Sequence, residues 1–490
     1  MNYTLLSRVF GALLLMLSAA MLCCVAFAWW EMRREVHVHA TEAFLISFAI
    51  TFGAGLLLSL KGWNCATEML RKEAVVVVGG GWIISALFGA LPYVFSSPGL
   101  SFVHALFESM SGFTTTGSTV IAELQQIPHA ILLWRSLTQW LGGLGILVLF
   151  VALLSHLGVG GKSLFRLESS ARVGENTAAR IKDTAKIFCF VYLALSGTCL
   201  GGLLLLGMTP FDAICHAMTT VATGGFSTHN ESIAYFESFS IEIFLTVMMV
   251  LSSLSFFLYV AVVRRDWARL KAEEEAKFFL LLVAGSTLAV VINLTFETHV
   301  YENFGEAARG AIFQVASIVT TTGFASEDYD QWPGFAMALL LVLMVFGGCA
   351  GSTAGGIKMS RVLLFSRIAR QEIITSFRPR QIFALNLNGS PAEGAARTVP
   401  IYIAMFGVVI PIGALTLALL EPGMSFDTCL SATLATLFNV GPGFGAVGPT
   451  QTFADFGAPA CLVMTLLMAL GRLELFAILV LFVPSLWRKF

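Results

Sequence analysis

Four short segments rich in threonine and glycine recur along the 490-residue sequence. They are Gly112–Ser118, Thr220–Phe226, Val319–Phe324 and Phe438–Phe444. Aligning Gly117, Gly224, Gly323 and Gly441 gives spacings of 107, 99 and 118 residues, and such recurrence indicates a structural repeat. A ring of main-chain carbonyl oxygens can replace the hydration water of a potassium ion. Glycine freely adopts the backbone conformations that aim carbonyls at one axis.

We expect the ion ligands to come from the three residues that end at each aligned glycine. They are Thr115, Thr116 and Gly117; Ala222, Thr223 and Gly224; Thr321, Thr322 and Gly323; and Asn439, Val440 and Gly441. The fourth set departs from the Thr-Gly pattern. The alternative explanation for these glycines, close helix packing through small residues, does not account for a fourfold recurrence.

A moderately apolar stretch precedes each of the four segments. The stretches are Val103–Phe113, Asp212–Thr220, Ala308–Val319 and Asp427–Phe438. Each is shorter than the roughly 20 residues that a bilayer-spanning helix needs. Non-helical backbone at membrane depth is tolerated only when it lines a wet cavity or is buried in protein. The sequence therefore predicts half-helices that enter the membrane and return, with their partially negative C-terminal ends facing a central path.

The composition requires a membrane protein made of helices. Hydrophobic residues make up 57% of the chain and charged residues 12%, which leaves no room for a large soluble domain. Ten spanning helices are predicted, at 9–30, 42–60, 74–95, 130–155, 187–207, 239–263, 277–297, 334–376 with an interruption, 398–420 and 457–484. The first is longer than the apolar core of a signal peptide and ends in two tryptophans, so we interpret it as a retained span.

Basic residues predict the orientation of the chain. The N-terminus and the segments 61–72, 156–186, 264–277, 358–397 and 488–489 hold 24 of the 29 lysines and arginines. The positive-inside rule puts these segments in the cytoplasm, together with both termini. The opposite loops carry acids, at Glu123, Glu231, Glu297, Glu302, Glu327, Asp328, Asp330 and Asp455. These acids would either raise the local cation concentration or form an ordinary solvated surface.

The four segments resemble the filters of the Trk, Ktr and HKT superfamily of potassium transporters, and in particular those of the TrkH family, the membrane subunits of bacterial Trk systems. The resemblance covers nearly the whole chain. It implies an all-α polytopic membrane protein of the bacterial inner membrane, with four helix–pore loop–helix repeats in a pseudo-fourfold arrangement and two extra N-terminal transmembrane helices. The implied units are 1–70 for the extra helices, then 71–160, 161–265, 266–380 and 381–490 for the repeats. Glycine at all four aligned positions implies a preference for potassium.

The eighth predicted span is broken by a run rich in glycine, residues 347–358. Each glycine costs a helix roughly 1 kcal/mol relative to alanine. The resemblance implies an intramembrane loop that obstructs the pore until it moves; close helix packing is the alternative. The predicted gate residues are Gly347, Gly348, Gly351, Ser352, Thr353, Gly355, Gly356, Lys358 and, in the last span, Arg472. Arg472 would act as an electrostatic barrier to cations or form a salt bridge with Glu474 or Glu108.

Partners and alternatives follow from the same comparison. The resemblance implies a homodimer in the lipid bilayer, with one pore per subunit, and a cytosolic, TrkA-like regulatory ring that binds nucleotides. Potassium would be cargo, and neither an organic cofactor, nor enzymatic activity, nor nucleic-acid binding is expected. Gly443–Gly448 matches a dinucleotide motif but follows a half-helix rather than a strand. The alternatives left open are a sodium-permeable member and a sodium- or proton-coupled symporter of the same superfamily. A secondary transporter of another fold would show two inverted repeats instead.

Overall fold

A computed structural model supplies the structure of this protein. It describes residues 1–32, 39–63, 71–97, 99–143, 145, 178–297, 300–301, 303–381, 385–388, 390–392, 395–473 and 475–487. The end of the predicted span 130–155, most of the basic segment 156–186, and the acids Glu302 and Glu474 lie outside the described residues.

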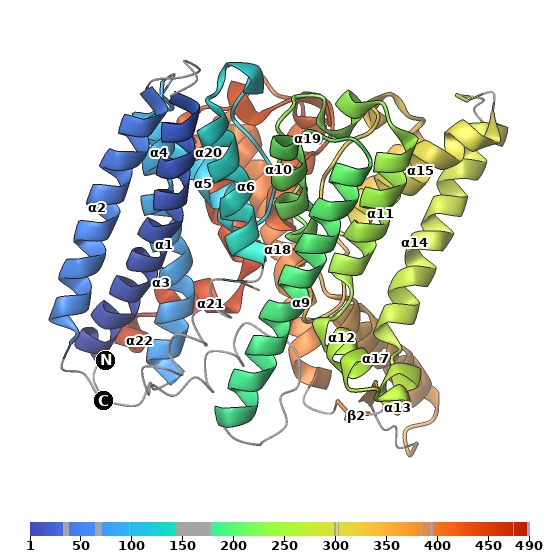
Figure 1. The fold of residues 1–490 in the computed structure, drawn as a ribbon. Helices are drawn as coiled ribbons and strands as arrows, with labels where there is room; N and C mark the ends of the chain where they lie inside the picture. Colours follow the sequence, from blue (N-terminus) through green and yellow to red (C-terminus); the bar gives the residue numbers. More distant parts are fainter. Residues whose placement is uncertain are drawn as a thin grey trace.

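Six helices of the described chain are long and apolar enough to cross a membrane. Two of them, α1 (Tyr3–Met32) and α2 (His39–Lys61), form a hairpin beside the rest of the molecule (Figure 1). The other four begin the four repeats: α3 (Arg71–Gly89) with its short continuation α4 (Leu91–Phe95), α9 (Ala178–Leu205), α14 (Glu275–Ile292) and α18 (Ala395–Leu420). The all-α architecture with two additional N-terminal helices is therefore confirmed.

A short helix follows the first long helix of each repeat. These helices are α5 (Phe102–Phe113), α10 (Pro210–Val221), α15 (Phe304–Val319) and α19 (Phe426–Leu437). Three begin at a side-chain cap, because Ser101, Thr209 and Ser425 accept backbone N–H groups of the first turn. Helices of 12 to 16 residues reach only about 18–24 Å. The four predicted half-helices are therefore confirmed.

Each repeat has a second helix after its short helix, and those of repeats 2 and 4 are shorter than the sequence predicts. The four second helices are α6 (His129–Gly143), α11 (Phe239–Ser253), α16 (Gly334–Leu343) and α20 (Ala458–Arg472). The predicted continuous span 239–263 is wrong, because α11 and α12 (Phe256–Val263) meet at an angle of 88°. The predicted span 457–484 also breaks, after Arg472, into α21 (Phe476–Leu479), η7 (Val480–Phe482) and α22 (Pro484–Trp487).

The remaining elements connect the repeats. The loops after the short helices hold η1 (Leu124–Gln126), η2 (Ser232–Phe236), η4 (Tyr329–Gln331), η5 (Gly445–Val447) and η6 (Phe453–Asp455). At the end where both termini lie are α13 (Trp267–Ala272), α17 (Met359–Phe377) and a small antiparallel pair, β1 (Asn386–Leu387) with β2 (Ser390–Pro391) (Figure 1). The π-helical turn η3 (Asn293–Glu297) ends α14.

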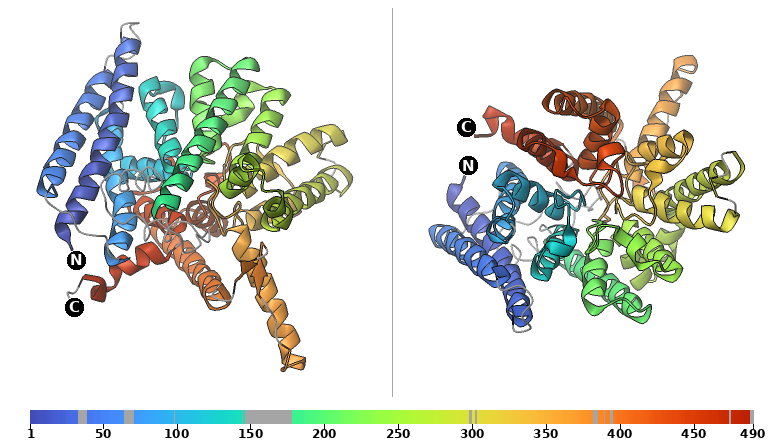
Figure 2. Two further views of the ribbon diagram at one scale, coloured as in Figure 1. Left: turned by 60° about the horizontal axis from the view of Figure 1, so that its bottom comes forward. Right: turned by 90° about the horizontal axis from the view of Figure 1, so that it is seen from above.

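The four repeats surround one centre. Viewed from above, they follow one another around the molecule, and the α1–α2 hairpin lies outside this circle, next to repeat 1 (Figure 2). Second helices pack on the short helix of the next repeat, in the pairs α6–α10, α11–α15 and α20–α5. The last of these pairs joins repeat 4 to repeat 1, so the circle closes. This arrangement brings the C-terminal ends of the four short helices to the middle.

Candidate functional site

The four short helices end in the same backbone conformation. Thr115, Thr223, Thr321 and Asn439 all have a left-handed φ of 53–55°. The next residue then donates its N–H to the carbonyl five residues earlier, at 2.8–2.9 Å. These bonds are Thr116–Ser111, Gly224–Thr219, Thr322–Ser317 and Val440–Ala435. A left-handed conformation in a β-branched residue is uncommon and costs energy. Its recurrence shows that these segments share one local structure.

This shared structure corrects the register of the second segment. Two residues after each left-handed position lies a glycine with positive φ: Gly117, Gly225, Gly323 and Gly441. The sequence alignment with Gly224 is wrong by one residue. Ala222 has a helical φ of −73° and ends α10, so it belongs to the helix cap. The equivalent set in repeat 2 is Thr223, Gly224 and Gly225, since two adjacent glycines cannot be distinguished by residue type alone.

The four glycines form a closed ring of backbone contacts. A Cβ on Gly117 would lie within 3.0 Å of the Gly224 carbonyl oxygen. A Cβ on Gly225 would lie equally close to the Thr322 carbonyl oxygen. The ring continues from Gly323 to the Val440 oxygen and closes from Gly441 back to the Thr116 oxygen. Each glycine thus touches the carbonyl that precedes the equivalent glycine of the next repeat. Only a residue without a side chain fits there, since φ is positive as well.

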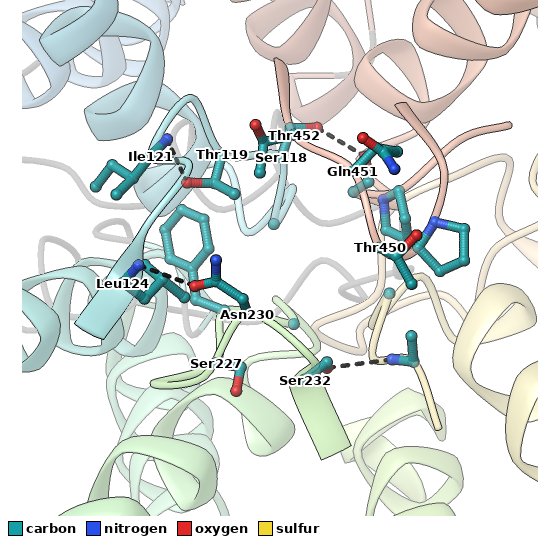
Figure 3. Close-up of a pocket in the computed structure, with 18 of the residues that line it drawn as sticks. Ser118, Thr119, Ile121, Leu124, Ser227, Asn230, Ser232, Thr450, Gln451 and Thr452 are labelled. Atoms are coloured by element: carbon teal, nitrogen blue, oxygen red, sulfur yellow. Dashed lines mark hydrogen bonds between the residues drawn. The ribbon is translucent and has the colours of Figure 1, made fainter. Parts of the chain in front are cut away.

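A cavity of about 100 Å³ lies above this ring, on the side away from the termini. All four ring glycines line it. Polar groups surround it, among them Ser118, Thr119, Asn230 and Gln451 (Figure 3). Asn230 ties two repeats together there, because its Oδ1 accepts the Leu124 N–H at 2.9 Å. The described lining residues include no acid. They do include a basic side chain, Arg135, whose guanidinium is paired with Glu108.

The glycine-rich segment between α16 and α17 lies on the other side of the ring. Thr353 Oγ1 donates to the Val221 oxygen at the end of α10, at 3.1 Å. Gly355 N donates to Thr321 Oγ1 at 2.6 Å, and Gly356 N donates to the Phe438 oxygen at 3.0 Å. The segment therefore touches the inner ends of repeats 2, 3 and 4 and crosses beneath the centre.

The same segment is held at both of its ends. Glu275 Oε1, at the start of α14, accepts the Ala350 N–H at 2.6 Å and the Ser360 N–H at 2.9 Å. Other predicted gate residues make internal contacts: Gly347 N donates to Ile357 O, Met359 N to Gly348 O, Ser352 Oγ to Cys349 O, and Lys358 Nζ to Ala354 O. Gly351 and Gly356 have positive φ. The segment is an ordered loop rather than a helix.

The loop also explains the break between α11 and α12. The Ser253 oxygen accepts the Cys349 N–H at 2.9 Å, and the Gly351 oxygen accepts the Phe256 N–H at 3.0 Å. Backbone groups that lose helical partners at the bend therefore bond to the loop. Residues 239–263 are mostly apolar and contain one charged residue, Glu242, which is why the sequence predicts an unbroken span.

Comparisons with known proteins agree with this geometry. The TrkH family, described as cation transport protein, matches residues 39–489. The chain belongs to the TrkH family. Over the full length of both chains, it is 36% identical to the Trk system potassium uptake protein TrkH of Halomonas elongata and 34% identical to that of Escherichia coli K12. The crystal structure of the potassium transporter TrkH from Vibrio parahaemolyticus superposes with a TM-score of 0.87, at 33% identity and full coverage of both chains.

In this TrkH family member, polar side chains on the short helices brace the strands that follow the ring residues. Glu108, His216 and Gln314 each lie seven residues before the left-handed position. Glu108 accepts the Val120 N–H at 3.0 Å, His216 Nε2 lies 3.0 Å from Ser227 Oγ, and the Gln314 carboxamide bonds to Ser326. In repeat 4 the neighbouring Ser431 bonds to Phe444 instead. Sequence reasoning missed this set, although a polar residue recurring at one position of apolar helices was a usable signal.

Arg472 joins the loop to repeat 1. Its guanidinium donates to the Thr353 oxygen at 2.8 Å and to the Gly142 oxygen at the end of α6 at 3.0 Å. Glu108, one carboxylate considered as its partner, bonds instead to Arg135 Nε at 2.7 Å. A cation at the C-terminal end of a helix is favoured by the partial negative charge there.

The acids of the opposite face are engaged with protein groups at two places. The Tyr301 hydroxyl donates to Glu327, and the Gly445 N–H donates to Asp330 at 2.8 Å. Burial raises the pKa of both carboxyls. Each therefore binds a proton more readily than an exposed acid does.

Proposed function

We propose that this chain is a potassium-selective, channel-like ion transporter that mediates potassium uptake across the cell membrane. The closed ring of four glycines and four carbonyls is the observation that carries the proposal. In the part of the chain that the structure describes, all four repeats meet at this ring. The relatives compared above are described as potassium uptake proteins, which supports the choice of ion.

The proposed filter consists of backbone carbonyls from four sets of three residues. They are Thr115, Thr116 and Gly117; Thr223, Gly224 and Gly225; Thr321, Thr322 and Gly323; and Asn439, Val440 and Gly441. Carbonyl dipoles replace the water that a potassium ion leaves behind. The negative C-terminal ends of α5, α10, α15 and α19 stabilise the ion beneath the ring. The cavity above the ring is the entrance.

The loop 347–358 and Arg472 form the proposed gate. The contacts of Thr353, Gly355 and Gly356 with three repeats favour a loop that blocks the path in this conformation. Arg472 adds a fixed positive charge beside the blocked path, which opposes a cation through Coulomb repulsion. Opening requires the loop to leave these contacts. A cytosolic, TrkA-like nucleotide-binding ring would supply the free energy for that change.

The proposed setting is the inner membrane of a bacterium, as a homodimer with both termini in the cytoplasm. The six spanning helices and the common end of the two termini support this orientation. The basic helix α17, with Arg361, Arg367 and Arg370, lies at that same end, as the positive-inside rule expects.

The test is rubidium and sodium uptake in cells that lack their own potassium systems, with the regulatory ring co-expressed. Gly117→Ser adds a side chain at a φ of 87° against the Gly224 carbonyl, so we expect loss of the preference for rubidium over sodium. Gly197→Ser, on α9 where a Cβ meets nothing within 4 Å, is the matched control. Absence of rubidium uptake by the unsubstituted chain would contradict the proposal. Uptake that requires external sodium would favour a coupled symporter.

A further inference from the structure

The second helix of repeat 1 differs from the other three at two positions that face the ring. The seventh and eleventh residues of α6 are Arg135 and Gln139. The corresponding residues of the other second helices are apolar and at most 1% exposed: Leu245 and Met249, Leu340 and Met344, Met464 and Met468. All four helices are aligned by counting from their first residue; for α6 and α20 the alignment is supported by the equivalent contacts of Gly142 and Gly471, with the Phe113 and Leu437 oxygens respectively.

Gln139 holds the filter strand of repeat 2 directly. Its Nε2 donates to the Gly224 oxygen at 2.6 Å, and its Oε1 accepts the Phe226 N–H at 3.1 Å. A Cβ on Gly224 would lie within 3.0 Å of the Gln139 carboxamide. The side chain of Gln139 therefore fills the space that a residue larger than glycine would occupy at position 224. Gln139 is completely buried, so water does not replace these bonds.

Arg135, one turn earlier on α6, holds the next part of the same strand. Its guanidinium lies 4.0 Å from the centre of the Phe226 ring and donates to the Ser227 oxygen at 3.0 Å. Glu108 of α5 neutralises its charge at 2.7 Å. Arg135 and Gln139 together bond to the backbone of three residues of the repeat 2 strand, Gly224, Phe226 and Ser227.

The ring residues explain why only repeat 2 needs this support. Position 224 is glycine, where the other repeats carry the β-branched residues Thr116, Thr322 and Val440. β-Branched side chains stiffen the backbone, whereas two successive glycines leave it with the greatest conformational freedom. The number and arrangement of carbonyl oxygens around the ion govern selectivity in such a filter, so the position of each strand matters. Polar side chains on the neighbouring helix can restore the missing rigidity from outside the strand.

We propose that Gln139, assisted by Arg135, is a positioning residue that determines ion selectivity by fixing the Gly224–Gly225 strand. This inference deepens the proposed function and rests on it. It predicts that selectivity depends on a residue that never contacts the ion. It also predicts that the residue types at 139 and 224 are coupled.

The test compares Gln139→Met with Met249→Leu as the matched control. Methionine stands at the same position in the other repeats, so the first change removes two hydrogen bonds with little change in volume. We expect the ratio of rubidium to sodium uptake to fall roughly five- to thirtyfold in Gln139→Met, the factor that one or two hydrogen bonds of about 1 kcal/mol each represent. The control keeps an apolar residue of similar volume and should retain the wild-type ratio.

A rescue experiment distinguishes positioning from general destabilisation. Gly224→Thr alone should impair transport, because its Cβ strikes Gln139. Combined with Gln139→Met, it gives repeat 2 the residue types of repeats 1 and 3, which have threonine at the position of Gly224 and methionine on the neighbouring helix. We expect the ratio of rubidium to sodium uptake to recover in this double variant. A merely unstable protein would lose both fluxes together and leave their ratio unchanged. Wild-type selectivity in Gln139→Met would overturn the inference while the proposed function stands. Absence of rubidium uptake by the unsubstituted chain would instead contradict the proposed function.

Discussion

Glu108 and Arg135 are charged residues that the fold buries almost completely, with exposed fractions of 0% and 1%. The Glu108 carboxylate and the Arg135 guanidinium lie 2.7 Å apart. The carboxylate also accepts the Val120 N–H of repeat 1, and the guanidinium donates to the Ser227 oxygen of repeat 2. A buried charge without a partner is costly, so each of the two residues depends on the other. The pair acts as a cross-link between two repeats.

We therefore expect Arg135→Leu to lower the free energy of unfolding by about 3–5 kcal/mol, because it leaves the Glu108 carboxylate buried and unpaired. Leucine is the residue at the equivalent position of α11, so its shape is compatible with such a site. The double variant Glu108→Gln/Arg135→Leu should recover much of the loss. Thermal unfolding in detergent measures both effects.

The control for this cycle is Arg367→Leu. Arg367 and Glu274 are 36% and 44% exposed, and such a surface pair contributes at most about 1 kcal/mol. If Arg135→Leu were no more destabilising than Arg367→Leu, the Glu108–Arg135 pair would not contribute to the free energy of unfolding more than a surface ion pair does.

Residue types alone located most of the glycine ring, but neither its register in repeat 2 nor the side chains that support it. The threonine and glycine pattern located the ring glycine in three of the four segments, at Gly117, Gly323 and Gly441. Repeat 2 has two adjacent glycines, and only the backbone conformation identifies Gly225 as the ring residue. The supports Glu108 and Gln139 are polar residues of apolar helices, and their partners are distant in the sequence.

At the scale of elements, the second helices of the four repeats are short. Three of them have 15 residues, about three quarters of the roughly 20 that a bilayer requires. The sequence predicts the break in repeat 3, since glycines mark it. It does not predict the bend between α11 and α12, because that bend depends on hydrogen bonds from the loop to Ser253 and Phe256.

The side chains of Glu275 and Arg472 both bond to the backbone of the loop 347–358, so replacing either one should favour opening of the proposed gate. Glu275→Ala removes the acceptor shared by the Ala350 and Ser360 N–H groups, and Arg472→Ala removes the bond to the Thr353 oxygen and the positive charge. We expect each variant to raise rubidium uptake severalfold when the regulatory ring is absent. Loss of one to two buried hydrogen bonds of about 1 kcal/mol each is sufficient for that shift.

The neighbouring Glu274 provides the control. Its carboxylate is 44% exposed and bonds to Arg367 rather than to the loop, so Glu274→Ala should leave uptake near the wild-type rate. Unchanged uptake in both Glu275→Ala and Arg472→Ala would mean that the loop is a fixed part of the wall and not a gate.

At the scale of the whole molecule, hydropathy and repeats were sufficient for the architecture. Four units of similar length, each with one short apolar stretch, have to place those stretches around one centre if none of them can cross a bilayer alone. The two N-terminal helices were also predictable, because their apolar runs precede the first repeat. Packing details were not predictable: Gly11 approaches Ser59 and Gly55 approaches Leu15 across the hairpin, where a Cβ would lie close to the neighbouring backbone.

The orientation of the whole molecule gives the last prediction. Gln451 is exposed beside the cavity above the ring, and Ser376 is exposed on α17, at the end that holds both termini. In a background with Cys23→Ala and Cys65→Ser, a membrane-impermeant maleimide should label Gln451→Cys in intact spheroplasts. Ser376→Cys should react only in inverted vesicles. The physical reason is the positive-inside rule, which holds α17 and its arginines on the cytoplasmic side.

The two labelling sites test separate parts of the fold. Labelling of both cysteines from one side would contradict the architecture, because the cavity and α17 would then share a face. A reversed pattern would keep the architecture but place the cavity in the cytoplasm, and the chain would then be oriented for export through the same ring. Uptake through a filter that the ion meets before the gate requires the first pattern, since only then does the ion enter the cavity from outside the cell.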